Sequence, residues 1–233
     1  LAALSRASGL ARVAGDADAA AAHASSAVAL AEESKDVQAL AVALTALGEA
    51  VVNAGDYDRG IEIHEQALAV ARETGQTPVP ILTNLADAAL AAGEAERAIE
   101  YSTQAAELAE GHDREPVRAI AAFNIASALI QRGRVSDARP HLREALDGVL
   151  KLEYPELLAW CLTAAAAVAA GSDDGDAAAL LGAADAIMDS VGGRPHWGKM
   201  HYQTAASLAP RYKHWDDFQA VRRRLDPEGR FAN

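Results

Sequence analysis

The sequence predicts an all-α protein, an α-solenoid of about five helical hairpins with a helical C-terminal cap. Apolar residues make up 51% of the chain but aromatic residues only 5%, so most of the apolar content is Ala and Leu, which favour closely packed helices. Few stretches show the period-two alternation of β-branched and aromatic residues that a sheet requires. Helix-breaking glycines recur at intervals of 40, 38, 40 and 38 residues: Gly15, Gly55, Gly93, Gly133 and Gly171.

Small residues recur at fixed distances from these glycines, which predicts two antiparallel helices around each glycine. One set follows five residues after the glycine and a second set seven residues later: Ala20, Gly60, Ala98 and Ala138, then Ala27, Ala67, Ala105 and Ala145. Pairs of a large and a small residue precede the glycine by eight and seven residues: Leu47-Gly48, Leu85-Ala86 and Ile125-Ala126. Small residues at these positions let the paired helices approach closely, while the large neighbours fill the space to the next hairpin.

This arrangement resembles the tetratricopeptide repeat family, whose pattern has a Leu-Gly pair on the first helix and two small positions on the second. The usual period of 34 residues is exceeded here, and the proline that usually ends the repeat is missing. The extra residues are expected to lengthen helices or links, as at Glu73–Pro80 and Glu110–Val117, where Gly and Pro cluster. The long repeats look like the sensor arrays of bacterial regulators. A generic array of Ala-rich hairpins is the alternative, and it gives the same solenoid.

The resemblance implies a protein-protein interaction scaffold that binds a peptide, a helix or a partner domain. In register with the family, the first helices of the hairpins would line a concave groove with Thr45, Glu49, Asn53, Thr83, Asp87, Phe123, Ser127 and Gln131. These residues are polar and mildly acidic, and they are centred on one aromatic side chain. Such a surface suits an extended peptide or a helix with Phe123 as the anchor, although the same residues could be solvated helix faces.

No set of side chains in the repeats indicates catalysis, so we expect no catalytic residue, no metal and no cofactor there. The histidines are scattered, and His64 occupies a position where the family prefers an aromatic residue, which favours a core role. There is no Gly-rich phosphate loop and no His-Glu-x-x-His helix. Asp56 and Asp58 are interpreted as turn and N-cap residues because the remaining ligands of a calcium loop are missing.

The net charge of −12 is unevenly distributed along the chain. Eight basic and four acidic residues give residues 194–233 a charge of +4, which leaves −16 for the 193 residues before them. An acidic body argues against direct nucleic-acid binding and leaves a protein or peptide as the expected partner. The sequence does not determine the oligomeric state.

Two further features indicate a cytoplasmic protein that does not enter the membrane. No secretory signal is present, and the Ala-rich stretch 164–170 is far shorter than the ~20 residues that span a bilayer.

Cys161 is the only cysteine, so a disulfide within the chain or a cysteine-based zinc site is excluded. Its apolar neighbours predict an inert core thiol.

After about residue 185 the composition changes, so we divide the chain into a repeat domain, 1–185, and a C-terminal segment, 186–233; residues 181–191 could belong to either. The segment contains Arg194-Pro195-His196-Trp197-Gly198-Lys199 and ends in Leu225-Asp226-Pro227-Glu228-Gly229-Arg230-Phe231-Ala232-Asn233. These motifs resemble the C-terminal end of FAD-dependent sugar-lactone and alditol oxidases of the gulonolactone oxidase type. The resemblance implies FAD as cofactor and places His196 and Lys199 by the substrate and flavin, with Lys199 as a cation near the sugar hydroxyls.

Two hypotheses for the segment remain. The rest of the oxidase family, including its flavin-binding domain, is absent from this sequence, and the cofactor carries the hydride chemistry. We therefore favour an amphipathic helical cap built on the aromatic residues Trp197, Tyr202, Tyr212, Trp215 and Phe218. The alternative is an oxidoreductase fragment or subunit whose tail completes a flavin site supplied by another chain. Arg222–Arg224 are expected to pair with the acidic body, because no aromatic stacking pattern for nucleic acid surrounds them.

Overall fold

The structure is a computed structural model that describes residues 2–109, 111, 114–152, 154–170, 177–190, 209–211 and 215–225. Within these ranges the regular elements are helices and none is a strand, which confirms the predicted all-α fold. Five helical hairpins follow one another: α1 (Ala2–Val13) and α2 (Ala17–Ser34), α3 (Val37–Asn53) and α4 (Tyr57–Glu73), α5 (Val79–Ala92) and α6 (Ala95–Leu108), α7 (Arg114–Gln131) and α8 (Val135–Leu152), α9 (Pro155–Ala170) and α10 (Ala177–Ser190).

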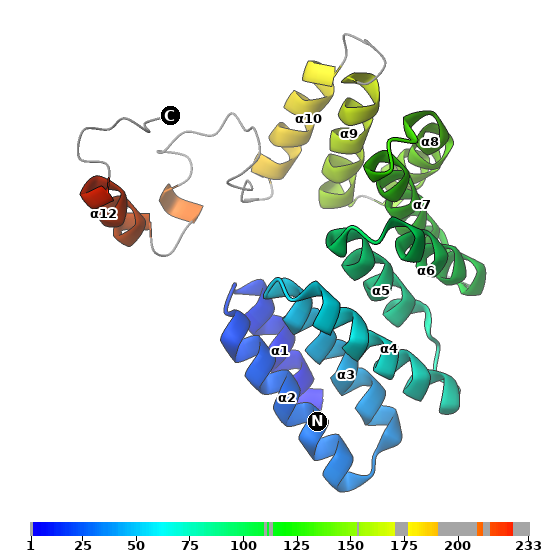
Figure 1. Cartoon of the computed structure of the whole chain (residues 1–233), viewed down its shortest axis with the longest axis vertical. Helices are drawn as coiled ribbons and strands as arrows, with labels where there is room; N and C mark the ends of the chain where they lie inside the picture. Colours follow the sequence, from blue (N-terminus) through cyan, green and yellow to red (C-terminus); the bar gives the residue numbers. More distant parts are fainter. Residues whose placement is uncertain are drawn as a thin grey trace.

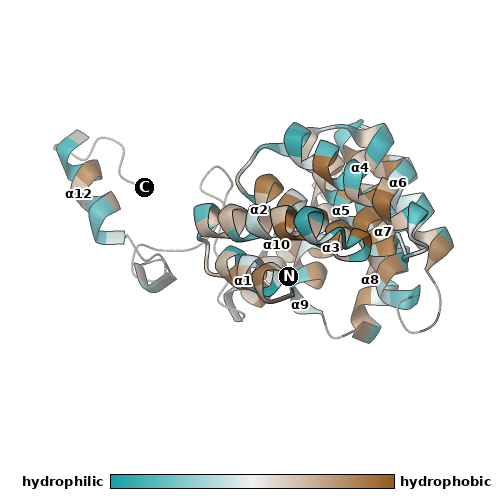
Figure 2. Ribbon diagram, turned by 90° about the horizontal axis from the view of Figure 1, so that it is seen from below, coloured by the Kyte–Doolittle hydropathy of each residue, from teal (hydrophilic) through white to brown (hydrophobic). Residues whose placement is uncertain are grey.

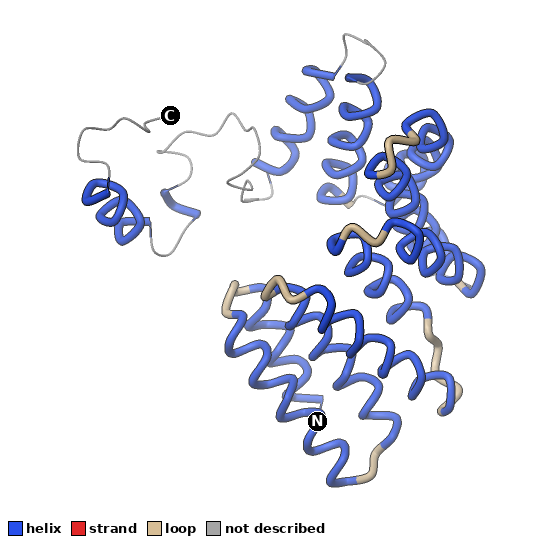
Figure 3. The backbone as a smooth tube through the Cα atoms, in the orientation of Figure 1, coloured by secondary structure: helices blue, strands red, loops and turns tan. Residues whose placement is uncertain are grey.

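The hairpins stack into a curved array of two layers (Figure 1). The odd-numbered helices form one layer, because α1 contacts α3, α3 contacts α5, α5 contacts α7 and α7 contacts α9. The even-numbered helices α2, α4, α6 and α8 each pack against their odd-numbered partner and the odd-numbered helix that follows, and α10 packs against α9. Successive helices are joined by short loops and turns through most of the array (Figure 3). The first helices of the hairpins therefore make a continuous wall, as the repeat register predicts.

Turns inside the hairpins form at the predicted glycines. Gly15, Gly55, Gly93 and Gly133 have φ angles between 71° and 93°, a region that is strained for residues with a Cβ atom, whereas Gly171 lies outside the described residues. In the first half of the array, aspartate N-caps at intervals of twenty residues mark the starts of three helices. Asp16, Asp36 and Asp56 accept backbone hydrogen bonds of 3.0, 3.0 and 3.2 Å from the third residue of the helix that each begins.

Alanine packing holds the two helices of each hairpin together. The small residues that recur around each glycine are all buried, most of them with no more than 1% of their surface exposed: Ala20, Ala27, Gly60, Ala67, Ala98, Ala105, Ala138 and Ala145. Larger residues, such as Leu82, Leu85 and Leu157, fill the space between hairpins. Hydrophilic and hydrophobic residues alternate around α4 and α6, as expected for helices with one face on a core (Figure 2).

Two glycines, Gly48 and Gly60, allow a close approach of helices α3 and α4. A Cβ atom on Gly48 would lie 2.6 Å from Cε1 of His64, and one on Gly60 would collide with Cγ2 of Val52. Val52 also presents its backbone nitrogen 3.3 Å from that Cβ position, so moving a side chain would not relieve the crowding. Both residues have ordinary helical backbone angles, so backbone conformation does not require glycine at these positions. The lack of space for a Cβ atom does.

We expect Gly60→Ala to lower the free energy of unfolding by about 1–3 kcal/mol, because the added methyl group forces α3 and α4 apart. Gly9→Ala on α1 is the matched control, since no atom lies within 4 Å of the new Cβ. That substitution should raise stability by about 0.5–1 kcal/mol through helix propensity. Urea unfolding followed by circular dichroism measures both, and equal effects of the two substitutions would contradict the close approach.

His64 is a core residue, as its position in the repeat predicts. Its ring is 1% exposed, lies against Gly48, and leaves Nδ1 without a hydrogen-bond partner in the described structure. Burial lowers the pKa of His64 from 6.5 to about 4. The folded state thus binds fewer protons than the unfolded state between these pH values, so the stabilisation is complete above pH 6.5 and is lost as the pH falls toward 4.

His64→Phe should therefore reduce the loss of stability on acidification. The wild-type chain is expected to lose about 3 kcal/mol more than the variant between pH 7 and pH 4. Thermal or urea unfolding of both proteins across this range gives the comparison. Asp87, whose pKa is raised, acts in the opposite direction in both proteins and cancels in the difference. A pH profile unchanged by the substitution would show that His64 is not buried in its neutral form.

Beyond α10 the structure describes a 3-10 turn, Ala209–Arg211, and α12 (Trp215–Leu225). The rings of Trp215 and Phe218 on α12 lie 5.9 Å apart. The other aromatic residues of the predicted cap, Trp197, Tyr202 and Tyr212, lie outside the described residues, so the seating of a cap on α10 stays a prediction. The proposed boundary at residue 185 falls inside α10, which continues to Ser190. No described helix combines the length and apolar character needed to cross a membrane.

Candidate binding groove

A cavity of about 590 Å³ opens on the layer of first helices, between α3, α5 and α7. Three of the eight residues predicted for the groove line it, namely Thr45, Glu49 and Thr83. The remaining lining residues are largely apolar: Thr77, Val79, Pro80, Asn84, Leu108, Ala109, Pro116 and Val117. The cavity thus combines apolar walls with a few polar groups, the usual composition of a binding site.

The residues that lengthen the repeat supply much of this wall. Thr77 lies in the link between α4 and α5, Ala109 follows α6, and Pro116 and Val117 stand in the first turn of α7. These are the two regions in which Gly and Pro cluster in the sequence. The departure from the usual repeat length therefore forms the rim of the cavity.

Side-chain hydrogen bonds connect successive hairpins along the same layer. Asn84 Nδ2 on α5 donates to Glu49 Oε1 on α3 at 3.0 Å, and Asn124 Nδ2 on α7 donates to Asp87 Oδ1 on α5 at 2.6 Å. Arg12 on α1 extends the series, with Nε 3.5 Å from Glu49 Oε2. We call Arg12, Glu49, Asn84, Asp87 and Asn124 the inner ladder. The two asparagines occupy the same register of successive repeats, so the ladder is a property of the repeat itself.

Asp87 is the acidic group most affected by its surroundings. The concave wall removes water from its carboxylate, and this desolvation raises the pKa of Asp87 to about 6, while the hydrogen bond from Asn124 acts in the opposite direction. The side chain is nevertheless exposed at the surface, and water that reaches it limits the rise. Asp87 is therefore a carboxylate that a ligand can reach and that the protein solvates poorly.

The other predicted groove residues have different surroundings. Gln131 Nε2 donates to the backbone oxygen of Leu90 at 3.1 Å, so it ties the end of α7 to the end of α5. Asn53 is exposed and donates to the backbone oxygen of Glu49 at 2.7 Å. Ser127 is half-buried on α7. None of these three lines the cavity, and their role in binding stays a prediction.

Phe123 stacks on Trp160, a residue that is not among those predicted for the groove. The ring centroids lie 6.2 Å apart with an interplanar angle of 29°. Phe123 is half-buried, whereas 48% of Trp160 is exposed. The aromatic surface open to a ligand at this end of the array therefore belongs chiefly to Trp160 on α9. Its place on the first helix of the fifth hairpin was a signal that could have identified it.

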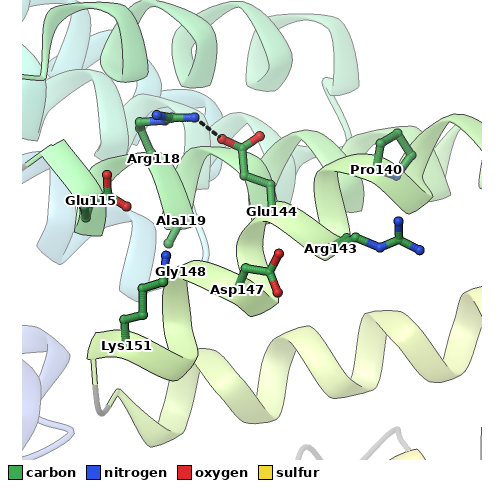
Figure 4. Close-up of a pocket in the computed structure, with 9 residues that line it drawn as sticks. All are labelled: Glu115, Arg118, Ala119, Pro140, Arg143, Glu144, Asp147, Gly148 and Lys151. Atoms are coloured by element: carbon green, nitrogen blue, oxygen red, sulfur yellow. Dashed lines mark hydrogen bonds and ion pairs between the residues drawn. The ribbon is translucent and has the colours of Figure 1, made fainter.

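Two other hollows lie away from the inner ladder. One, of about 540 Å³, lies between α7 and α8, where acidic and basic side chains alternate and Arg118 Nη2 pairs with Glu144 Oε1 at 2.6 Å (Figure 4). Its three acidic and three basic residues balance: Glu115, Glu144 and Asp147, with Arg118, Arg143 and Lys151. The other, of about 750 Å³, is mainly apolar and lies among α8, α9 and α10.

Comparison with protein families identifies both parts of the sequence. Models described as tetratricopeptide repeat match residues 43–77 and 77–151. The chain carries tetratricopeptide repeats. Such repeats are protein-interaction modules, and here they supply the helices that line the cavity and carry most of the inner ladder.

Two solved structures share the fold of the array. One is a putative kinesin light chain of Podosopora anserina with nearly identical TPR-like repeats, which has a TM-score of 0.61 and 18% identity over 82% of this chain and 95% of that one. The other is BtubC (BKLC) from P. vanneervenii, with a TM-score of 0.58 and 24% identity over 85% of this chain and 84% of that one. At these identities the comparison supports the fold of the tetratricopeptide array and nothing about its ligand.

The C-terminal part of the chain is similar to a different protein family. A family model described as D-arabinono-1,4-lactone oxidase matches residues 161–233. L-gulono-1,4-lactone dehydrogenase of Mycobacterium tuberculosis is 63% identical over 51 residues, which are 22% of this chain and 12% of that enzyme. An alditol oxidase of a Streptomyces species is 48% identical over 46 residues, 20% of this chain and 11% of the enzyme. The chain thus spans about an eighth or less of the length of these curated relatives.

The residues that the oxidase resemblance singled out, His196 and Lys199, lie outside the described residues. Cys161 is buried, and this burial raises the pKa of its thiol to about 12, as expected for an inert core cysteine. Within the described ranges, no group of three or more His, Cys, Asp or Glu side chains could hold a metal ion.

Proposed function

We propose that the chain is a protein-interaction scaffold whose concave groove binds an extended peptide segment of a partner protein. The cavity between α3, α5 and α7, with the inner ladder beside it, is the observation that carries this proposal. The resemblance of the long repeats to sensor arrays of bacterial regulators supports a role in a bacterial regulatory protein.

Polar groups around the cavity leave bonding capacity for a peptide backbone. The hydroxyl groups of Thr45 and Thr83 donate to backbone oxygens of their own helices at 2.8 and 3.0 Å, so their oxygen lone pairs can still accept. Asn84 uses one amide hydrogen on Glu49 and keeps a second hydrogen and its carbonyl oxygen. An extended peptide offers alternating N–H and C=O groups that match this set.

The stacking of hairpins supplies the rigidity that a binding surface needs. The wall helices α3, α5 and α7 pack against wall helices on both sides, and the inner ladder joins α1, α3, α5 and α7. Groups held in place before binding lose less conformational entropy when the ligand arrives. Leu108, which is 50% exposed at the cavity, can become covered in the complex.

Peptides selected on the full chain from a random display library test the proposal. Thr83→Arg places a long side chain in the cavity and should weaken the selected peptides by about tenfold or more. Thr103→Arg is the matched control, because Thr103 is exposed on α6 and donates the same kind of hydrogen bond, to Ile99 at 2.8 Å. Fluorescence anisotropy measures both affinities. Selected peptides that bind Thr83→Arg as well as wild type would argue against the groove.

A second candidate function rests on the 63% identity to the gulonolactone dehydrogenase segment. In this alternative the C-terminal segment completes the flavin site of an oxidoreductase whose remaining domains come from another chain. The described residues include neither His196 nor Lys199. The described part therefore offers no fitted site for FAD, and we derive no catalytic step from it.

The oxidoreductase alternative predicts a flavin absorbance band that stays with the protein through gel filtration after FAD is added. Lys199→Ala should weaken that retention, while Lys151→Ala on α8 serves as a control for loss of a surface cation. A colourless protein fraction, with FAD eluting separately, would leave the segment without a flavin role in this chain.

A further inference from the structure

The two carboxylates of the inner ladder, Glu49 and Asp87, have different charged neighbours. Glu49 receives a hydrogen bond from Asn84 and faces the guanidinium of Arg12. Asp87 receives a hydrogen bond from Asn124, but no ion pair found among the described residues includes it. The ladder thus contains Glu49, which pairs with a cation. Asp87 stands in the same register of the next hairpin, and none of the ion pairs found among the described residues includes it.

Arg12 is an example, within the chain, of a cationic side chain that contacts a carboxylate of this wall. A long cationic side chain from α1 reaches across to a carboxylate whose other oxygen is held by an asparagine. Asn124, which is 2% exposed, holds Asp87 in the same way at 2.6 Å. Because the wall around Asp87 partly desolvates its carboxylate, a neighbouring cation would gain more there than at a carboxylate in open water.

The apolar cavity lies next to Asp87. Thr83 lines the cavity, and Asp87 stands one helical turn further along α5, a separation of about 6 Å along the helix axis. An extended peptide advances about 3.3 Å per residue and places every second side chain on the same face. Two side chains that enter the cavity and reach Asp87 are therefore about two positions apart in a peptide that runs along α5.

We propose that the groove binds a basic extended segment of a partner protein, with a Lys or Arg side chain on Asp87 and an aliphatic or prolyl residue two positions away in the cavity. This inference rests on the proposed scaffold function and names its ligand. Asn124 is a positioning residue, since it orients the carboxylate without meeting the ligand. The charge of −16 on residues 1–193 attracts such a segment and repels an acidic one.

Three labelled peptides test the ligand class on the full chain by fluorescence anisotropy. The first carries Val-Ser-Arg between Gly-Ser flanks, the second Val-Ser-Glu, and the third Val-Arg-Ser, which turns the arginine to the opposite face. The first peptide should bind about tenfold more tightly than either of the others, and its affinity should fall as salt is added. Equal binding of the Arg and Glu peptides would overturn the proposal without any variant.

Asp87→Asn removes the charge while Asn at this position still accepts the hydrogen bond from Asn124. The variant should bind the Val-Ser-Arg peptide about tenfold more weakly and lose most of its preference over Val-Ser-Glu. Glu96→Gln is the matched control, because it removes one negative charge from an exposed site on α6 that pairs with Arg132. Circular dichroism verifies that both variants keep the helical fold.

The outcomes separate this inference from the scaffold function. Unchanged affinity in Asp87→Asn, with binding still blocked by Thr83→Arg, would refute the basic ligand and keep the groove. Binding that survives Thr83→Arg would count against the groove itself and therefore against both proposals. An equal loss in Asp87→Asn and Glu96→Gln would reduce the effect to net charge and overturn the role of Asp87.

Discussion

The close approach of two helices at small side chains is the constraint on which the rest of the molecule depends. At each crossing an alanine or glycine lets the backbones come near, and at Gly48 and Gly60 no larger residue fits. This approach sets the width of a hairpin, and the width determines where the next first helix stands. The wall, the cavity and the side-chain ladder between hairpins all follow from that spacing.

Polar side chains fix the relative position of neighbouring hairpins, in addition to the packing of alanines. The apolar contacts between hairpins are not directional, whereas the bonds from Asn84 to Glu49 and from Asn124 to Asp87 relate particular residues on neighbouring helices. The outer layer has directional contacts of its own, since Arg97 and Tyr101 on α6 donate to Glu65 on α4 at 2.7 and 2.8 Å. The ladder also brings two acidic groups to the surface where a ligand would lie.

Much of the fold could be predicted because its signals are local. Each turn depends on a glycine in its own segment, and early helices begin at aspartate caps, so spacing alone placed the hairpins. The groove was predicted less well, because its walls come from three hairpins. Thr45, Glu49 and Thr83 followed from the repeat register, but Leu108 and Val117 enter from link regions whose path the register does not describe. Likewise, the partner of Phe123 lies on α9, and nothing local to Phe123 indicates how far that helix is rotated.

The oxidase-like family match begins in the middle of a helix of the array. The repeat match ends at residue 151 and the oxidase-like match begins at residue 161, whereas α9 runs without interruption from Pro155 to Ala170. Leu157 before this point and Cys161 and Val168 within the match share one buried cluster. One residue added or removed between Leu157 and Cys161 would rotate the following part of α9 by about 100° and move Val168 out of that cluster. An insertion or deletion in the first half of α9 must therefore preserve helical phase if both halves of the helix are to stay in that cluster.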